Sequence, residues 1–259
     1  MRLAAVIFDW AGTMVDFGSC APVEAMRAGF EAEGVVVADE EIRAFMGLAK
    51  RDHVASILAV PRVASAWMKA RGVAHDDQDV DRIFVRLDPL MREAGARRAD
   101  LVPGAADAAR ALASLGVRIG STTGYTRAMM EPILAAAARQ GYEPETVVCA
   151  GETLIGRPSP FMIWTALMRM GVWPARAVCK IDDAPVGIAE GKSAGCLTIG
   201  VAVSGNAMGL DLSDFQRLTP DERRHRIAAA RSELLAAGAD LVIETVAEAP
   251  AALAALGAT

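Results

Sequence analysis

An acidic residue near the start of the chain is placed to act as a nucleophile. Asp9 follows the apolar run 4–8 and precedes a short turn, 10–13, that contains alanine and glycine. The apolar run is typical of a buried strand, and the carboxyl ends of parallel strands line the crevice where open α/β sheets bind ligands. A carboxylate in that place can attack phosphorus or carbon and form a covalent intermediate. The chemistry predicted for Asp9 is therefore nucleophilic substitution.

Three later segments carry groups that suit an anionic substrate and a metal ion. The run 119–125 offers hydroxyls and backbone N–H groups just before an expected helix, and such groups can bind phosphoryl oxygens. Arg157 offers a planar fork of donors. Asp182 and Asp183 follow an apolar run and, with Asp9, could supply the acidic ligands of Mg²⁺. Each segment alone is typical of a turn, a surface arginine or a helix cap, but together they favour one site.

The composition of the chain excludes several other classes of function. A net charge of -5 and a pI near 5.3 provide no basic field for nucleic acid. The 4 cysteines lie far apart and only 3 histidines are present, so reduced structural thiols are expected rather than a zinc site. Asp9 interrupts the first hydrophobic run, and no run reaches the roughly 18 apolar residues of a membrane helix. We therefore expect a cytoplasmic protein without nucleic-acid or membrane partners.

Short apolar runs separated by helical segments predict the fold. The expected strands are 4–8, 117–120, 147–150, 177–181, 197–201 and 241–243. Strands that alternate with helices favour a parallel sheet with right-handed crossovers. The first two runs are separated by about a hundred residues of helical periodicity, far more than one crossover needs. We predict an α/β protein with a Rossmann-like core, 1–19 and 99–259, and an inserted helical cap domain, 20–98, over the ligand-binding edge.

One expected cap helix contains a lysine that could face this edge. If the segment from residue 46 onward is helical, Met46, Lys50, His53 and Ile57 fall on one face. Taken alone, this stripe is more typical of a core-facing helix whose lysine reaches outward to solvent.

The motifs together resemble the phosphonoacetaldehyde hydrolase family of the haloacid dehalogenase superfamily. The segments that carry the resemblance are 8–13, 46–53, 61–67, 120–127, 141–142 and 156–158. In most of the superfamily the first motif is Asp-x-Asp-x-Thr, and its second Asp protonates the leaving oxygen, whereas this chain has Ala11 there. The resemblance implies the haloacid dehalogenase fold and hydrolysis of phosphonoacetaldehyde to acetaldehyde and phosphate, in 2-aminoethylphosphonate degradation, with Mg²⁺ and a lysine Schiff base.

The resemblance also implies a role for each residue that matches a motif of the family. Asp9 would be the nucleophile, and Lys50 would form the imine. The residues expected around the imine are Met46, His53 and Tyr125. Those expected to bind the phosphonate are Thr123, Gly124, Arg157 and Gly12. Those expected to hold Mg²⁺ are Asp9, Asp183 and the backbone carbonyl of Ala11.

One position departs from the superfamily pattern. Many members carry a second acidic residue four positions after the first in the last motif, and this chain has Gly187 there, after Asp183. Asp182 would compensate through water or through contacts with the metal ligands.

The pairing of Ala11 with Lys50 suits a phosphonate rather than a phosphate ester. A phosphonate must lose a carbanion, which a simple general acid cannot stabilise. A protonated imine accepts that electron pair as an enamine, so the missing aspartate is not needed. An ordinary lysine with a pKa of about 10.4 is almost fully protonated at neutral pH, so Lys50 needs desolvation or a cationic neighbour. His53 is the expected proton shuttle.

Other functions stay open at this point. A haloacid dehalogenase uses the same nucleophile without the second Asp and needs no metal, while a phosphomonoesterase would need the acid that Ala11 removes. A catalytically lapsed binding protein is a third alternative. The resemblance also suggests a homodimer built through the cap, with the amphipathic run 22–30 as a candidate contact, although such a stripe more often faces the protein's own core.

Overall fold

The sheet of this protein is wholly parallel. The computed structural model describes residues 3–257, in which six strands have the order β3-β2-β1-β4-β5-β6. Their bounds are β1 Ala5–Phe8, β2 Arg118–Thr123, β3 Thr146–Cys149, β4 Val178–Asp182, β5 Leu197–Val201 and β6 Leu241–Ile243. All five neighbouring pairs are parallel. The predicted Rossmann-like α/β class is confirmed, and the strands match within one or two residues except that β2 extends to Thr123.

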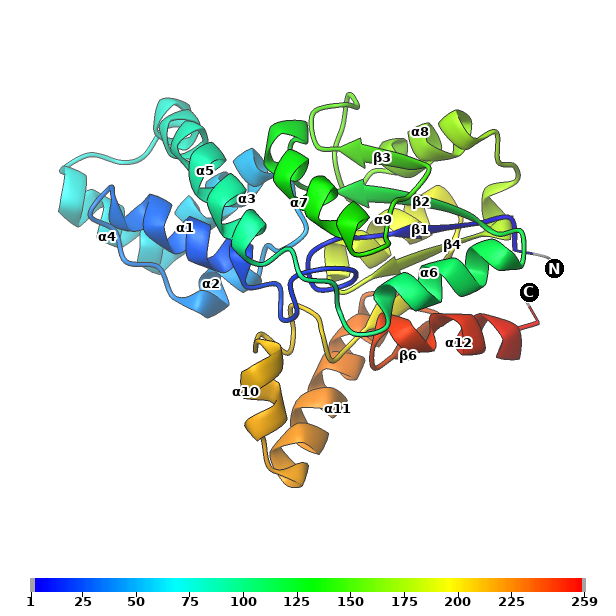
Figure 1. Ribbon diagram of the computed structural model, residues 1–259. Helices are drawn as coiled ribbons and strands as arrows, with labels where there is room; N and C mark the ends of the chain where they lie inside the picture. Colours follow the sequence, from blue (N-terminus) through cyan, green and yellow to red (C-terminus); the bar gives the residue numbers. More distant parts are fainter. Residues whose placement is uncertain (1–2, 258–259) are drawn as a thin grey trace.

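Helices cover both faces of the sheet (Figure 1). The helices that follow the return to the sheet are α6 Ala105–Ser114, α7 Arg127–Arg139, α8 Phe161–Met170, α9 Pro185–Ala194, α10 Leu212–Arg217, α11 Pro220–Ala236 and α12 Ala249–Ala255. The side chains of β1 alternate between two core clusters, as the pleat of a strand requires. Val6 and Phe8 pack in the cluster of α6, α7 and α12, whereas Ala5 and Ile7 pack in that of α8. The central strand is therefore apolar on both faces.

A group of helices lies beside the carboxyl ends of the strands (Figure 1). Its members are α1 Ala21–Glu31, α2 Asp39–Arg43, α3 Lys50–Leu58, α4 Pro61–Arg71 and α5 Asp77–Arg97, and α5 packs against both α1 and α3. The apolar residues of α1, within the run 22–30, are buried inside this chain. That run is therefore part of the protein's own core, and the homodimer and the domain boundaries at 19/20 and 98/99 stay predictions.

The stretch predicted as one helix from residue 46 is not continuous. Helix α3 begins at Lys50, and Met46 lies in the preceding loop. Gly47 has φ +92, and a Cβ there would lie 2.9 Å from a methyl group of Val186. The chain therefore turns sharply at Gly47 where it passes α9, and this turn ends the shared helical face.

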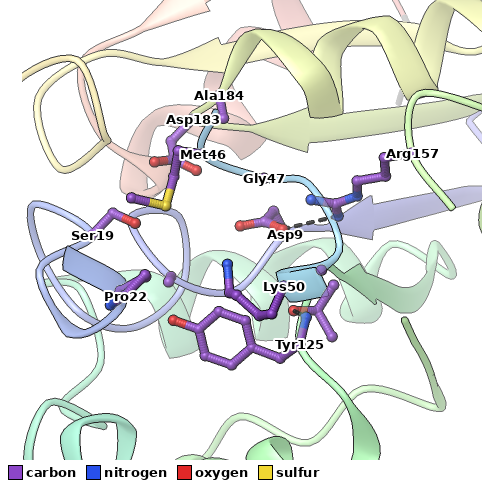
Figure 2. Close-up of a pocket in the computed structure, with 13 residues that line it drawn as sticks. Asp9, Ser19, Pro22, Met46, Gly47, Lys50, Tyr125, Arg157, Asp183 and Ala184 are labelled. Atoms are coloured by element: carbon purple, nitrogen blue, oxygen red, sulfur yellow. Dashed lines mark hydrogen bonds and ion pairs between the residues drawn. The ribbon is translucent and has the colours of Figure 1, made fainter. Parts of the chain in front are cut away.

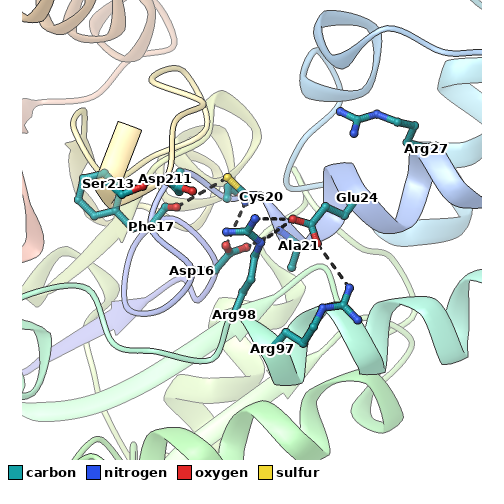
Figure 3. Close-up of polar contacts among 12 residues, drawn as sticks. Asp16, Phe17, Cys20, Ala21, Glu24, Arg27, Arg97, Arg98, Asp211 and Ser213 are labelled. Atoms are coloured by element: carbon teal, nitrogen blue, oxygen red, sulfur yellow. Dashed lines mark hydrogen bonds and ion pairs between the residues drawn. The ribbon is translucent and has the colours of Figure 1, made fainter. Parts of the chain in front are cut away.

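The segments 16–19 and 97–101 lie side by side where the chain leaves and rejoins the sheet (Figure 3). The Asp16 carboxylate accepts hydrogen bonds from the N–H groups of Cys20, at 3.1 Å, and Ala21, at 2.9 Å. It therefore caps α1, whose own N-cap residue makes no side-chain cap. Arg98 lies just after α5 and donates to Glu24 of α1 at 2.7 Å. The first turn of α1 therefore forms hydrogen bonds with both segments, through Asp16 and Arg98.

No helix among residues 3–257 has the length and apolar character that crossing a membrane requires.

Gly187 lies where α9 passes the end of β4. A Cβ at this position would lie 1.9 Å from Oδ2 of Asp182 and 2.0 Å from its Cγ. The Asp182 carboxylate is fixed in place: Oδ1 accepts the Ala184 N–H at 3.0 Å, and Oδ2 lies 3.0 Å from Nζ of Lys180. The carboxylate of Asp182 therefore fills the space that a side chain at position 187 would need, which gives a physical reason for the glycine.

We expect Gly187→Ala to lower the free energy of unfolding by about 1–3 kcal/mol, because its methyl group overpacks a buried site. The loss should appear even though alanine favours a helix interior over glycine by up to about 1 kcal/mol. Urea unfolding measures it. Gly156→Ala is the control, because its Cβ would meet only a methyl group at 3.9 Å. Unchanged or increased stability of Gly187→Ala would contradict the steric argument.

Candidate active site

A small cavity lies at the carboxyl ends of β1, β2 and β4, beneath the loop that precedes α3 (Figure 2). The empty space at this site, including the solvent at its opening, is about 290 Å³. The predicted residues that line it are Asp9, Ala11, Met46, Lys50, Thr123, Gly124, Tyr125, Arg157 and Asp183. Four further lining residues were not predicted: Ser19, Pro22, Gly47 and Ala184. Gly47 lies within the segment 46–53 but was given no role, and the other three lie in no motif, so only the folded chain shows that all four reach the cavity.

The Asp9 carboxylate is buried at the end of β1 and faces Arg157 (Figure 2). Its Oδ1 lies 2.9 Å from Nη2 of Arg157, and this pair is almost fully buried. Burial raises the pKa of Asp9 to about 6, and the nearby Asp182 carboxylate adds to the rise, while Arg157 and Lys180 oppose it. At neutral pH, Asp9 is therefore mostly ionised and can act as a nucleophile.

The carboxylates of Asp9, Asp182 and Asp183 form one buried cluster in which an oxygen of each lies within 4.8 Å of the others. Asp183 accepts the N–H of Asn206 at 2.7 Å, but it has no ion-pair partner among residues 3–257. Burial and the other two carboxylates raise its pKa well above the ordinary value. A buried carboxylate without a cation is costly, so this oxygen cluster fits a hard divalent cation such as Mg²⁺.

Gly12 does not line the cavity; it lies against Asp183 of the carboxylate cluster. Its φ is +83, and a Cβ there would lie 2.2 Å from Oδ2 of Asp183. Its carbonyl accepts a hydrogen bond from Ser204 Oγ at 2.7 Å. The contacts of Gly12 therefore belong to the support of Asp183, and its predicted substrate contact stays a prediction.

Lys50 is the first residue of α3, and its side chain reaches into the cavity beside Tyr125 (Figure 2). Nζ lies 4.8 Å from the centre of the Tyr125 ring, and the residue is only 2% exposed. Burial lowers the pKa of Lys50 to about 8, and Arg157 contributes in the same direction, although Asp9 and Asp183 oppose the shift. Desolvation therefore lowers the pKa of Lys50 more than its cationic neighbour Arg157 does.

His53 is buried one turn further along α3 but does not line the cavity. Its Nε2 lies 2.7 Å from the carbonyl oxygen of Ile42, and its Nδ1 has no hydrogen-bond partner. Burial, helped by the charge of Lys50, lowers the pKa of His53 to about 3. The ring is therefore neutral, with Nε2–H donating to Ile42 and Nδ1 left as an acceptor. Its role as a proton shuttle stays a prediction.

The loop before α3 touches the sheet at Gly124. A Cβ at Gly124 would lie 2.5 Å from the carbonyl oxygen of Leu48 and 2.8 Å from that of Gly47. Only glycine allows the two backbones to approach this closely. Thr123 precedes this contact at the end of β2, and its Oγ1 accepts the Tyr125 N–H at 3.2 Å. The segment predicted to bind phosphoryl oxygens is thus in direct contact with the loop that leads to Lys50.

The sequence of this chain is similar to a family model and to several named proteins. Residues 3–195 match the family model described as haloacid dehalogenase-like hydrolase. A protein named phosphonoacetaldehyde hydrolase from Paraburkholderia xenovorans (strain LB400) is 48% identical over 247 residues, which cover 95% of this chain and 92% of that protein. One of the same name from Bacillus cereus (strain ATCC 10987 / NRS 248) is 37% identical over 248 residues, 96% and 94% of the two chains.

The fold of this chain is also similar to that of solved structures. A crystal structure described as a phosphonoacetaldehyde hydrolase like protein from Oleispira antarctica superposes with a TM-score of 0.97 and 38% identity, covering 99% of this chain and 93% of that one. A β-phosphoglucomutase from Clostridium difficile, with a TM-score of 0.63 and 16% identity over 95% and 93% of the chains, shares the fold alone. The chain therefore belongs to the haloacid dehalogenase-like hydrolases and, within them, to the phosphonoacetaldehyde hydrolase family.

Proposed function

We propose that this hydrolase cleaves the carbon–phosphorus bond of phosphonoacetaldehyde to give acetaldehyde and phosphate, as a step of 2-aminoethylphosphonate degradation. The observation that carries the proposal is that a buried amine, Lys50, and a carboxylate nucleophile, Asp9, line one cavity in which Ala11 replaces the usual general acid. The names of the relatives support the same substrate. A phosphatase or a dehalogenase has no use for the buried amine.

Lys50 acts on the leaving group. Its neutral amine attacks the aldehyde carbon and, with loss of water, forms an imine that is then protonated. When the carbon–phosphorus bond breaks, its electron pair moves onto the imine nitrogen and leaves an enamine. Proton uptake at the terminal carbon and hydrolysis then release acetaldehyde and return the amine. The low-dielectric surroundings of Lys50 favour the neutral amine that starts this sequence.

Asp9 acts on the phosphorus. Its carboxylate attacks in line with the carbon–phosphorus bond and takes the phosphoryl group as an acyl phosphate, which water then hydrolyses. Arg157 and the backbone N–H groups at Thr123 and Gly124 are placed around the same cavity to bind the phosphoryl oxygens. Asp9 leaves its ion pair with Arg157 as it reacts, so the guanidinium becomes free to pair with the oxygens of the transferred group.

The oxygen cluster at this edge suits a bound Mg²⁺ in the proposed reaction. Asp9, Asp183 and the carbonyl of Ala11 would hold the ion, with Asp182 beside them. When bound, Mg²⁺ would neutralise negative charge on the phosphonate and on the clustered carboxylates.

The proposal is tested by the products of the purified protein. With phosphonoacetaldehyde and Mg²⁺ we expect equal amounts of acetaldehyde and phosphate, measured by a coupled dehydrogenase assay and a phosphate assay. EDTA should abolish both products, and added Mg²⁺ should restore them. Turnover of a halo-acid that survives EDTA, with no phosphate released from phosphonoacetaldehyde, would instead assign a dehalogenase.

Lys50 is tested by trapping the imine. Borohydride added with substrate should reduce it to a stable amine on the peptide that contains Lys50, detected by mass spectrometry. Lys50→Arg should lower kcat by roughly 10³-fold or more, because a guanidinium keeps the charge but is not a useful nucleophile. Lys192→Arg is the control, since Lys192 is a surface lysine paired with Asp240 at 2.8 Å. An active enzyme that yields no adduct at Lys50 would refute the imine.

The pH dependence of kcat/KM should report the Lys50 amine. Imine formation needs the neutral amine, whose fraction rises as the pH rises through a pKa of about 8. At pH 7 roughly one-tenth of such an amine is neutral, so kcat/KM should rise roughly tenfold per pH unit below 8 and level off above it. Below pH 6 the slope should steepen, because Asp9 is protonated there as well. A plateau that begins near pH 6.5, or only above pH 10, would contradict the burial of a reactive amine.

A further inference from the structure

A second layer of charged groups lies behind the cavity. Glu190 of α9 is fully buried and does not line the cavity. Three donors converge on its Oε2: Arg157 Nε at 2.8 Å, Thr122 Oγ1 at 3.1 Å and Lys180 Nζ at 3.5 Å. A carboxylate is costly to bury without such partners. The reaction described above gives Glu190 no role.

The contacts of Arg157 divide into two sides. Nε faces Glu190, while Nη2 lies 2.9 Å from Asp9 Oδ1 and donates to the Thr122 carbonyl oxygen at 2.8 Å and to Thr122 Oγ1 at 2.9 Å. Nε makes no hydrogen bond within the described part of the chain, so Glu190 acts on this side through its charge, while the hydrogen bonds of Nη2 set the direction of the planar guanidinium. Arg157 also lines the cavity, and among the contacts described for residues 3–257 none involves its Nη1.

The two carboxylates closest to Arg157 differ in how long they can serve as its counter-ion. Asp9 ceases to be a free carboxylate when it becomes an acyl phosphate, whereas Glu190 lies outside the cavity and takes no part in the bond changes. Lys180, the other cation of the network, has its own carboxylate in Asp182 at 3.0 Å. Glu190 is therefore the carboxylate that can hold Arg157 in place while Asp9 is reacting.

We propose that Glu190 is a positioning residue that acts through Arg157, holding its guanidinium in the orientation that binds phosphoryl oxygens. Its importance during turnover rests on the proposed function, but the binding of a free phosphate anion by Arg157 does not. A merely structural Glu190 would stabilise the fold without affecting anion binding.

A double-mutant cycle separates these two roles. The variants are Glu190→Gln, Arg157→Ala and the double variant, and the probe is inorganic phosphate, whose Kd is measured by calorimetry in the presence of Mg²⁺. We expect Glu190→Gln to weaken phosphate binding by roughly tenfold or more, because a neutral amide lacks the negative charge that forms the ion pair with the guanidinium. In the Arg157→Ala background the same substitution should change the Kd by less than about twofold, since the group through which it acts is absent.

Glu33 supplies the matched control. It is a buried glutamate with arginine partners, Arg71 at 2.9 Å and Arg86 at 2.6 Å, but it lies in the turn after α1 and does not line the cavity. Glu33→Gln should lower the unfolding midpoint and leave the phosphate Kd unchanged. If Glu190→Gln proves too unstable to study, Glu190→Asp keeps the charge, with an expected intermediate loss of affinity that still disappears without Arg157.

Three outcomes would overturn the inference. They are an unchanged Kd in Glu190→Gln, an equal loss of affinity with and without Arg157, and no phosphate binding by the wild type. Failure of the proposed function gives a different result. A wild type that binds phosphate but does not hydrolyse phosphonoacetaldehyde contradicts that proposal, while the cycle still reports whether Glu190 acts through Arg157.

Discussion

The buried ion pair between Arg157 and Asp9 is the interaction on which the site depends. Both side chains are removed from water at the end of β1, where an isolated charge would be very costly. Lys180, Asp182, Asp183 and Glu190 lie beside this pair and are also buried, so the whole group, with Asp9 and Arg157, holds four carboxylates and two cations. Burial raises the pKa of Asp9 and Asp183, and the neighbouring carboxylates add to the rise, so a divalent cation suits the cluster.

The two reacting groups come from different parts of the chain. Asp9 stands at the end of a central strand of the sheet, whereas Lys50 begins a helix of the inserted segment. They meet because the loop before α3 lies against Gly124 with backbone in contact with backbone. Lys50 follows this loop directly and is buried beside Tyr125, and that burial lowers the pKa of its amine. The position of α3 against the sheet thus both places Lys50 in the cavity and removes it from water.

Much of this arrangement could be predicted from local sequence, and the exceptions have physical reasons. Apolar runs identified the strands, and the residues that follow them, such as Asp9 and Asp183, identified the edge of the sheet that binds ligands. The start of α3 at Lys50 was missed, because it depends on how the turn at Gly47 passes α9. Glu190 was missed because its partners come from three separate segments that only the strand order brings together.

The fit between Asp182 and position 187 also limits how the sequence of this protein can drift. The carboxylate of Asp182 and a side chain at 187 compete for one volume, so a chain that relocated this acid to 187 would have to lose it at 182. An acidic residue introduced at 187 alone would overlap Asp182, and loss of Asp182 alone would leave this volume without a carboxylate. The two positions are therefore expected to change only as a pair among relatives, and the identity of either residue would predict the other.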